Sequence, residues 1–326
     1  MMSGFFRSNQ KTLVVLALVL LIGGITGLFQ RTFIAEANLA SMGKYIGLYG
    51  LLTIGVTFVI ITGGIDLSIG SLVGVSGVLL PMLLVEQQMS PAAAMGIVLC
   101  CGAGIGVIHG LLITKLKLQP FLVTLCGLFI YRSVARSIAD DRAKGFGNEY
   151  AGMKAFFVKD KFLDIVPMPL VILIVVGLVA AFFLNKTAYG RYLLAMGRNE
   201  EAARFSGIST DNVKMVAYII CSTLAAFGGM MFVMDDNSAT PSIFGNFFEL
   251  YAIAGAVLGG CSLRGGEGAV AGVILGAALV QVSADAVFFL GVKDTWKYAV
   301  IGGFILIGVM MDEFMRRYGE RRRAVS

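Results

Sequence analysis

The side chains in this sequence that could do chemistry are a few ionisable residues set in or beside long apolar runs. Asp66 lies between two such runs, in TGGIDLSIG, and His109, the single histidine, lies within another. Because a charged group at membrane depth is costly, such residues are candidates for function by default. Asp66 could act as a functional or conformational carboxylate, and His109 could act as a proton relay.

Each of these residues also has a purely structural interpretation. Asp66 could cap a following helix by accepting the backbone N–H of Ser68 or Ile69, a role that is compatible with a functional one. His109 lies beside a glycine stripe, which favours a hydrogen-bonded packing residue over a relay. Other charges lie near the outer ends of their runs, and they could find partners across the bundle, but we favour simple solvation for them: Arg132, Arg136, Glu249 and Asp285.

Catalytic motifs are missing from the sequence. It contains no G-x-x-x-x-G-K-[ST] loop for phosphate, no H-E-x-x-H metal motif and no G-x-S-x-G nucleophile. The five cysteines lie in or at the edge of apolar runs without metal-ligand spacing, and we predict that they are small buried side chains. We therefore expect no enzyme activity, no metal and no cofactor in this chain. If ATP drives the protein, a partner subunit binds it.

The elements that must position these residues are membrane spans. The chain of 326 residues is 57% apolar and 14% charged, whereas a soluble domain is about 25% charged. This composition excludes a soluble enzyme, a disordered chain and a nucleic-acid binder, and it predicts an all-α, polytopic membrane protein. We predict ten transmembrane helices, at residues 12–29, 45–64, 67–85, 92–113, 119–138, 168–184, 213–234, 247–260, 268–290 and 297–311.

Two further features concern individual spans. The first run follows Arg7 and Lys11 as in a signal peptide, but it lacks an A-x-A exit and is predicted to be an uncleaved span. Glycines at every fourth residue predict close packing of helix backbones in two spans. These glycines are Gly102, Gly106 and Gly110 in one span and Gly268, Gly272 and Gly276 in the other.

The distribution of positive charge predicts the orientation. With an even number of spans, more of the lysines and arginines fall on the side of the two termini, including the dense RRYGERRR segment at 316–323. The positive-inside rule then places both termini in the cytoplasm. The whole chain, 1–326, is one transmembrane domain with an outer loop at about 139–167 and an inner loop at about 185–212.

The inner loop carries the strongest local signal. Asn199 can cap a short helix, Glu200 and Glu201 suit its first turn, and Gly207 can end it. Small Ala202 and Ala203 would give this helix a small-residue face. Such a helix could insert into a groove of a partner protein, or it could lie on lipid headgroups.

Two glycine-rich segments echo each other. GGIDLSIGSLVG at 63–74 and GGCSLRGGEGAVAG at 259–272 are both predicted to be turns that join two spans at the inner face. Glycine-rich apolar sequence produces such matches easily, so we favour similar turns over an internal duplication.

Four separated motifs resemble one family. TGGIDLSIG at 62–70, KLKLQPFLVTL at 115–125, GRYLLAMGRNEEAARFSGI at 190–208 and GAVLGGCSLRGGEG at 255–268 together resemble the permease subunit of bacterial ABC importers for monosaccharides, the ribose, xylose and galactose type. The resemblance runs from the second to the ninth predicted span. It departs at Arg264 and Glu267, which give the last turn a charged character, and in the outer loop.

The resemblance implies a function, partners and sites. It implies a multi-pass protein of the bacterial inner membrane that works with a cytoplasmic ATPase, a second permease copy or homologue, and a periplasmic sugar-binding protein. The inner loop becomes the ATPase-coupling segment, with Gly197, Asn199, Glu200, Ala202, Ala203 and Gly207. The second, third, fifth and eighth spans come near the translocation path, with possible pathway residues Thr62, Gly63, Gly64, Asp66, Ser68, Gly70, Gln119, Pro120, Phe121 and Thr124.

A second class of function stays open at this point. A secondary transporter driven by an ion gradient would need a carboxylate or histidine relay deep in the bundle. Asp66, Asp285 and His109 are the available groups, and the sequence places all three near an interface. The ABC permease is therefore the favoured prediction.

Overall fold

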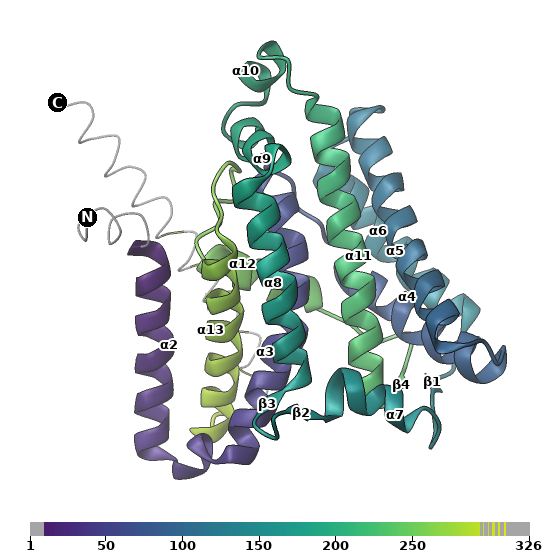
Figure 1. The fold of residues 1–326 in the computed structure, drawn as a ribbon, viewed down its shortest axis with the longest axis vertical. Helices are drawn as coiled ribbons and strands as arrows, with labels where there is room; N and C mark the ends of the chain where they lie inside the picture. Colours follow the sequence, from purple (N-terminus) through teal and green to yellow (C-terminus); the bar gives the residue numbers. More distant parts are fainter. Residues whose placement is uncertain are drawn as a thin grey trace.

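The computed structural model describes residues 10–293 and, beyond them, residues 296, 299, 302, 303, 306 and 310. The described part is a bundle of helices with four two-residue strands (Figure 1). The helices are α2 Gln10–Phe29, η1 Arg31–Ile34, α3 Glu36–Ile61, α4 Ile69–Pro81, η2 Met82–Glu86, α5 Pro91–Thr114, α6 Pro120–Ile138, α7 Ala151–Lys154, η3 Ala155–Lys159, α8 Met168–Lys186, α9 Ala188–Arg198, α10 Glu200–Phe205, α11 Thr210–Asp236, α12 Phe248–Leu258 and α13 Val270–Phe289.

The described part confirms the all-α membrane architecture. Eight helical segments are long and apolar enough to cross a membrane, and they coincide with the first seven predicted spans and the ninth. The predicted span at 297–311 and both chain ends lie outside the continuously described residues. The total of ten spans and the sidedness of the termini therefore stay predictions.

The eighth predicted span, 247–260, is wrong as a complete helix. The helix α12 has 11 residues, which at about 1.5 Å per residue reach roughly 16 Å, against a hydrocarbon core of about 30 Å. The chain reaches the start of α12 through an irregular segment, residues 237–247, that follows α11. This crossing therefore combines a loop with half a helix.

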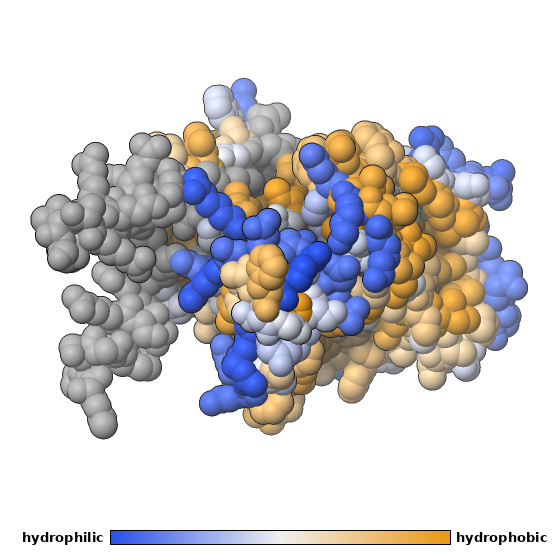
Figure 2. All heavy atoms as spheres, turned by 90° about the horizontal axis from the view of Figure 1, so that it is seen from above, coloured by the Kyte–Doolittle hydropathy of each residue, from blue (hydrophilic) through white to orange (hydrophobic). Residues whose placement is uncertain are grey.

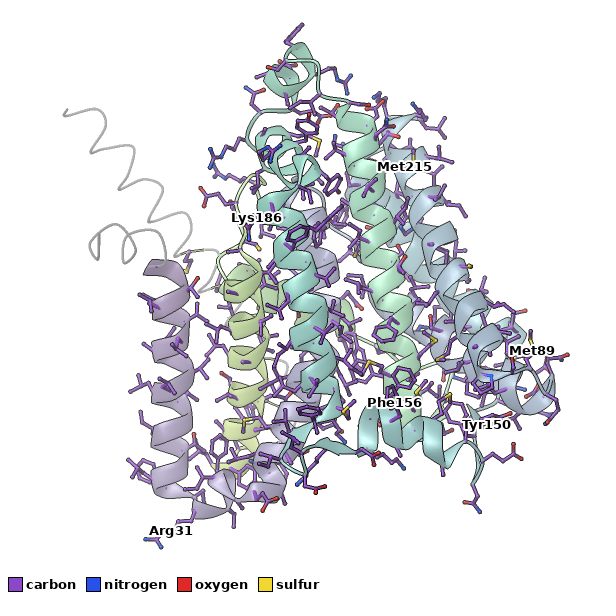
Figure 3. The ribbon with its side chains drawn as sticks, viewed as in Figure 1. Arg31, Met89, Tyr150, Phe156, Lys186 and Met215 are labelled. Atoms are coloured by element: carbon purple, nitrogen blue, oxygen red, sulfur yellow. The ribbon has the colours of Figure 1, made fainter. Side chains whose placement is uncertain are left out.

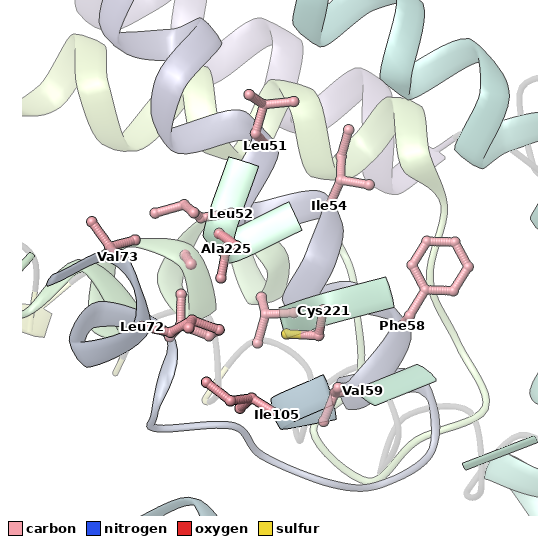
Figure 4. Packing of buried hydrophobic residues seen from close by; sticks show 14 of the residues in the cluster. Leu51, Leu52, Ile54, Phe58, Val59, Leu72, Val73, Ile105, Cys221 and Ala225 are labelled. Carbon is pink, nitrogen blue, oxygen red and sulfur yellow. The ribbon is translucent and has the colours of Figure 1, made fainter. Parts of the chain in front are cut away.

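The core lies where α3, α4, α5 and α11 pack together (Figure 4). Leu52, Ile54, Leu72 and Cys221 are among the side chains fully or almost fully buried there. Glycines make this packing close, because a Cβ atom added at Gly106 would lie 2.5 Å from the Cα of Ile219 on α11. The predicted packing role of the Gly102–Gly110 stripe is confirmed.

The bundle has two distinct ends (Figures 1 and 3). Lys186 lies towards the end that carries α9 and α10, and Tyr150 and Phe156 lie towards the opposite end (Figure 3). That opposite end holds the two antiparallel strand pairs. The pairs are β1 Lys144–Gly145 with β4 Ser238–Ala239, and β2 Lys161–Phe162 with β3 Val166–Pro167. We call the two ends the α10 end and the strand end.

Candidate functional site

The inner loop folds as two short helices at the α10 end. Thr187 caps α9 by accepting the N–H of Gly190 at 3.3 Å, and the hydroxyl of Tyr189 donates to the carbonyl of Val213 on α11. Burial raises the pKa of Tyr189 well above its usual value. Asn199 accepts the N–H of Ala202 at 2.9 Å, and Gly207 follows α10 with a φ of +83°. The predicted cap and stop are both confirmed.

Ion pairs hold α10 against the start of α11. Arg204 contacts Glu200 at 3.4 Å and Asp211 at 3.2 Å, and Glu200 also pairs with Lys214 at 2.6 Å. Lys117, from the loop between α5 and α6, reaches Asp211 at 3.3 Å. Single exposed pairs contribute little to stability, but this network links three chain segments and fixes the direction in which α10 projects.

The exposed face of α10 differs from the predicted one. Ala202 is exposed, but Ala203 is 5% exposed and belongs to the protein's own core. Phe205 is instead 91% exposed at the end of the helix. The prediction that Ala202 and Ala203 together form a free small-residue face is therefore wrong, because the second alanine anchors the loop to the bundle. The side chain exposed at the end of α10 is therefore the aromatic ring of Phe205.

A groove of about 640 Å³ opens beside this helix. It lies between the loop after α5 and the start of α11, and its lining includes Lys117, Gln119, Pro120, Arg204 and Phe205. Figure 2 looks onto the α10 end and shows hydrophilic residues gathered over it, with apolar surface around them. Gln119 and Pro120, which the sequence associates with a pathway, thus lie beside α10, and neighbouring Phe121 is also exposed.

Two glycine turns interlock against Gly197, near the end of α9. Gly266 donates its N–H to the carbonyl of Ile61 at 2.9 Å, and a Cβ atom on Gly197 would collide with both of those groups. A Cβ on Gly265 would lie 2.8 Å from the nitrogen of Gly63. The turn after α3 and the turn before α13 therefore meet at the same end, as the sequence predicts for the two glycine-rich segments.

Asp66 lies inside the bundle, in the extended segment that precedes α4. Its Oδ1 accepts the N–H of Ser68 at 2.9 Å and the Ser68 hydroxyl at 2.6 Å. The predicted contact with Ser68 is confirmed, but the predicted cap is wrong, because Ser68 occupies the N-cap position of α4 and Asp66 lies two residues before it. Both residues are fully buried. Among the described residues, Oδ2 of Asp66 has no hydrogen-bond partner, and it lies 4.0 Å from Nδ1 of His109.

His109 joins this carboxylate to α6 and α11. Its Nε2 lies 2.9 Å from the hydroxyl of Tyr131 on α6, and its ring meets the ring of Tyr218 on α11 edge-on at 6.1 Å. The hydroxyl of Tyr218 has no partner among the described residues. His109 is the buried, hydrogen-bonded residue that the sequence predicts, but its closeness to Asp66 and the two tyrosines could not be read from the sequence.

The other residues of the TGGIDLSIG motif shape the turn and the start of α4. Thr62 donates its hydroxyl to the carbonyl of Val59, and Gly64 lies against the hydroxyl of Tyr218. Thr124 on α6 donates to the carbonyl of Ile65 at 3.1 Å, which ties the extended segment to α6. Gly70 packs against Gly245 and against the carboxylate of Glu249, a residue from α12.

Two of the charges predicted to be solvated lie within the bundle instead, Glu249 buried and Arg132 half-buried. Arg132 on α6 donates to the carbonyls of Pro241 and Phe244, at 2.9 Å and 2.6 Å, and Glu249 is 7% exposed. The prediction failed because the chain re-enters the bundle before α12 and places these side chains inside. Arg136 is exposed as predicted and pairs with Asp141. Asp285 is half-buried and accepts a hydrogen bond from Gln281.

The cysteines differ in exposure from what the sequence predicts. All five cysteines are free thiols, and the described residues hold no group of three His, Cys, Asp or Glu side chains able to bind a metal ion. Cys221 and Cys261 are buried as predicted. Cys100 and Cys126 are exposed, so the prediction of burial is wrong for them. They lie on helix surfaces that the bundle leaves uncovered.

Comparison with known protein families shows which family this chain belongs to. Residues 38–310 match the family model described as "Branched-chain amino acid transport system / permease component". The chain belongs to this family of transport permeases. It is 34% identical to the ribose import permease protein of Escherichia coli (strain K12), over 93% of each chain. It is also 34% identical to the ribose import permease protein of Bacillus subtilis (strain 168), over 88% of each.

The permease has further relatives with other names. It is 28% identical to the fructose import permease protein of Rhizobium meliloti, over 96% of this chain and 88% of the relative. No solved structure gives a significant match. Together with the apolar helices, these relationships identify a multi-pass protein of the bacterial inner membrane and a permease subunit of an ABC importer. Its relatives are transport components and not enzymes.

Proposed function

We propose that this chain forms the translocation path for a monosaccharide or similar small polyol, delivered by a periplasmic binding protein and driven by a separate ATPase. The observation that carries the proposal is the α10 end. A capped helix, braced by ion pairs and ending in an exposed phenylalanine, projects from a bundle with no phosphate-binding loop in its sequence. Such a helix fits a groove on a partner, and the ATPase is the partner that an ABC permease requires.

The sides of the membrane follow from this assignment. If α10 docks on the ATPase, the α10 end faces the cytoplasm and the strand end faces the periplasm. The exposed lysines and arginines at the α10 end, among them Lys115, Lys117, Arg198 and Arg204, agree with the positive-inside rule. The binding protein would then dock at the strand end. The alternative of a helix lying on lipid headgroups fits less well, because α10 projects beyond the bundle (Figure 1).

A second permease copy or homologue would cover α6. This helix leaves Phe129, Ile130, Ser133, Val134 and Ser137 around a hollow of about 430 Å³ on its outer face. Serine hydroxyls gain little from contact with lipid, whereas small and polar residues are typical of contacts between membrane helices. We therefore place the contact between the two permeases at α6, with the translocation path beside it.

The cargo class rests on the relatives. The import permeases named above are named for ribose and fructose, and a 28% identical relative in Escherichia coli (strain K12) is named as a permease of a D-allose transport system. The family description names branched-chain amino acids. We assign a sugar because these relatives cover most of this chain, whereas the family description covers a wider group.

Reconstitution tests the proposal. Proteoliposomes that hold the permease, its ATPase and ATP should accumulate labelled sugar when the loaded binding protein is outside, and omission of any component should abolish uptake. D-ribose, D-fructose and D-allose are the probes, with leucine as the competing class. Uptake driven by an ion gradient through this chain alone would overturn the proposal and would assign proton coupling to the Asp66 and His109 pair.

A further inference from the structure

Between β4 at the strand end and α12, residues 240–247 are irregular backbone that runs into the interior of the bundle. The ring of Phe248, at the start of α12, lies 5.1 Å from the ring of Tyr49, half-way along α3. Gly245 packs against Gly70 and Val73 at the start of α4. Both α4 and α12 therefore begin inside the bundle, each after a non-helical stretch, and Figure 1 shows α12 between the two ends.

Much of this segment is not covered by the chain itself. Thr240, Ser242, Ile243, Asn246 and Phe247 are all exposed. Lipid cannot satisfy the hydrogen bonds of irregular backbone, so such backbone occurs at membrane depth only where protein covers it or where it lines a water-filled cavity. The exposed hydroxyl and amide groups favour water over an apolar cover.

The half-buried side chain of Arg132 holds the segment in place. Arg132 donates to the carbonyls of Pro241 and Phe244, which otherwise have no helix to satisfy them. Glu249 lies against Gly70. Phe247 has a φ of +66°, a left-handed conformation that residues with side chains rarely adopt and that persists only where the surroundings enforce it. The backbone that carries the exposed side chains is therefore held in place by the surrounding protein.

We infer that residues 240–247 form a subsite for the hydroxyl groups of a sugar on its way through the membrane, an inference that rests on the proposed function. The Asn246 amide nitrogen lies 3.5 Å from the backbone carbonyl oxygen of Ser242, and the side chains of Ser242 and Asn246 are both exposed. Both can donate and accept hydrogen bonds, and the ring of Phe247 offers an apolar face to the C–H groups of a sugar.

The lack of ionisable side chains in the segment also favours a neutral sugar as its ligand. Residues 237–247 contain no ionisable side chain, and Nη1 of the neighbouring Arg132 donates to two carbonyls of the segment. An amino-acid zwitterion would need partners for its carboxylate and ammonium groups, because charges away from water are costly when unpaired. A neutral polyol needs only hydrogen bonds, which the segment supplies.

Thiol labelling tests the inference. In a permease whose five native cysteines are replaced by serine, Ser242→Cys and Asn246→Cys are compared with Val179→Cys, a control on the apolar surface of α8 that is 64% exposed. A charged methanethiosulfonate reagent reacts with thiolate, which forms readily only in water. In nanodiscs we expect the two segment cysteines to react at least about tenfold faster than the control.

The second arm asks whether sugar occupies the segment. In proteoliposomes with ATPase, binding protein and ATP, the probe that is transported among D-ribose, D-fructose and D-allose should slow labelling at residues 242 and 246, and leucine should not. Equal, slow labelling of all three cysteines would overturn the inference, as would fast labelling that the transported sugar leaves unchanged. Transport of none of the probes would refute the proposed function instead, which separates the two failures.

Discussion

Replacing Phe205 with alanine should uncouple the permease from its ATPase without disturbing the bundle. The ring is 91% exposed, so truncation removes no contact of the folded chain. The cap at Asn199 and the ion pairs of Arg204 stay in place. A loss of ATPase binding would therefore report the interface directly.

The size of the effect follows from the exposed ring. An aromatic side chain buries roughly 150–250 Å², and at about 25 cal/mol per Å² its full burial would contribute several kcal/mol. Costs of binding reduce that figure, and truncation of an aromatic hot spot typically costs about 2 kcal/mol. This corresponds to a roughly 30-fold rise in Kd.

The assay is binding of the ATPase to the permease in nanodiscs, followed by sugar uptake in proteoliposomes. Leu163→Ala is the matched control, because Leu163 is a 75% exposed apolar residue in the loop at the strand end. The control should bind the ATPase with unchanged Kd. Unchanged ATPase binding by a correctly inserted Phe205→Ala protein would refute the assignment of α10 as the docking helix.

Four further substitutions, at three positions, have defined outcomes. Asp66→Asn keeps an acceptor for the N–H of Ser68 and should retain thermal stability while uptake falls. Asp66→Ala loses the two hydrogen bonds to Ser68 and should lower the free energy of unfolding by about 1 kcal/mol or more, and full uptake by it would contradict a functional role. Ala203→Trp overfills a buried position at a cost of about 1–3 kcal/mol and should speed proteolysis of the loop, which unchanged protection would disprove. The hydrogen bond from Arg136 holds the pKa of Asp141 below its usual range. The pair therefore stabilises the fold fully at a pH above the pKa that Asp141 has in the unfolded chain. This stabilisation is lost as the pH falls through the lower pKa that Asp141 has in the folded protein. Carbon NMR titration should show that pKa rising in Arg136→Gln, and an unchanged titration would exclude the pair.

Patterns of composition and local capping were sufficient to predict much of this architecture. Uninterrupted apolar runs give each span its place, since a helix must satisfy its own backbone hydrogen bonds in lipid. The short helix after Asn199 was also predictable, because its cap, first turn and terminating Gly207 lie within a few residues of one another. Signals of this kind depend only on neighbours in the sequence.

The predictions that failed depend on how distant segments meet. Arg132 and Glu249 lie near the ends of apolar runs, but the re-entrant loop brings backbone carbonyls to the arginine and buries the glutamate. Ala203 looks like part of a small exposed face until the packing of the loop is known. The approach of His109 to Asp66 joins residues of separate helices and leaves no periodic signal in the sequence.

The interlocked turns near the end of α9 have a mechanical consequence. Gly197, Ile61 and Gly266 touch through main-chain atoms, with no flexible side chain between them to take up a displacement. A joint of this kind is stiff, so a displacement of α9 and α10 cannot be absorbed locally. The displacement would be transmitted to the end of α3 and to the start of α13, and through the turn after α3 to the segment that carries Asp66.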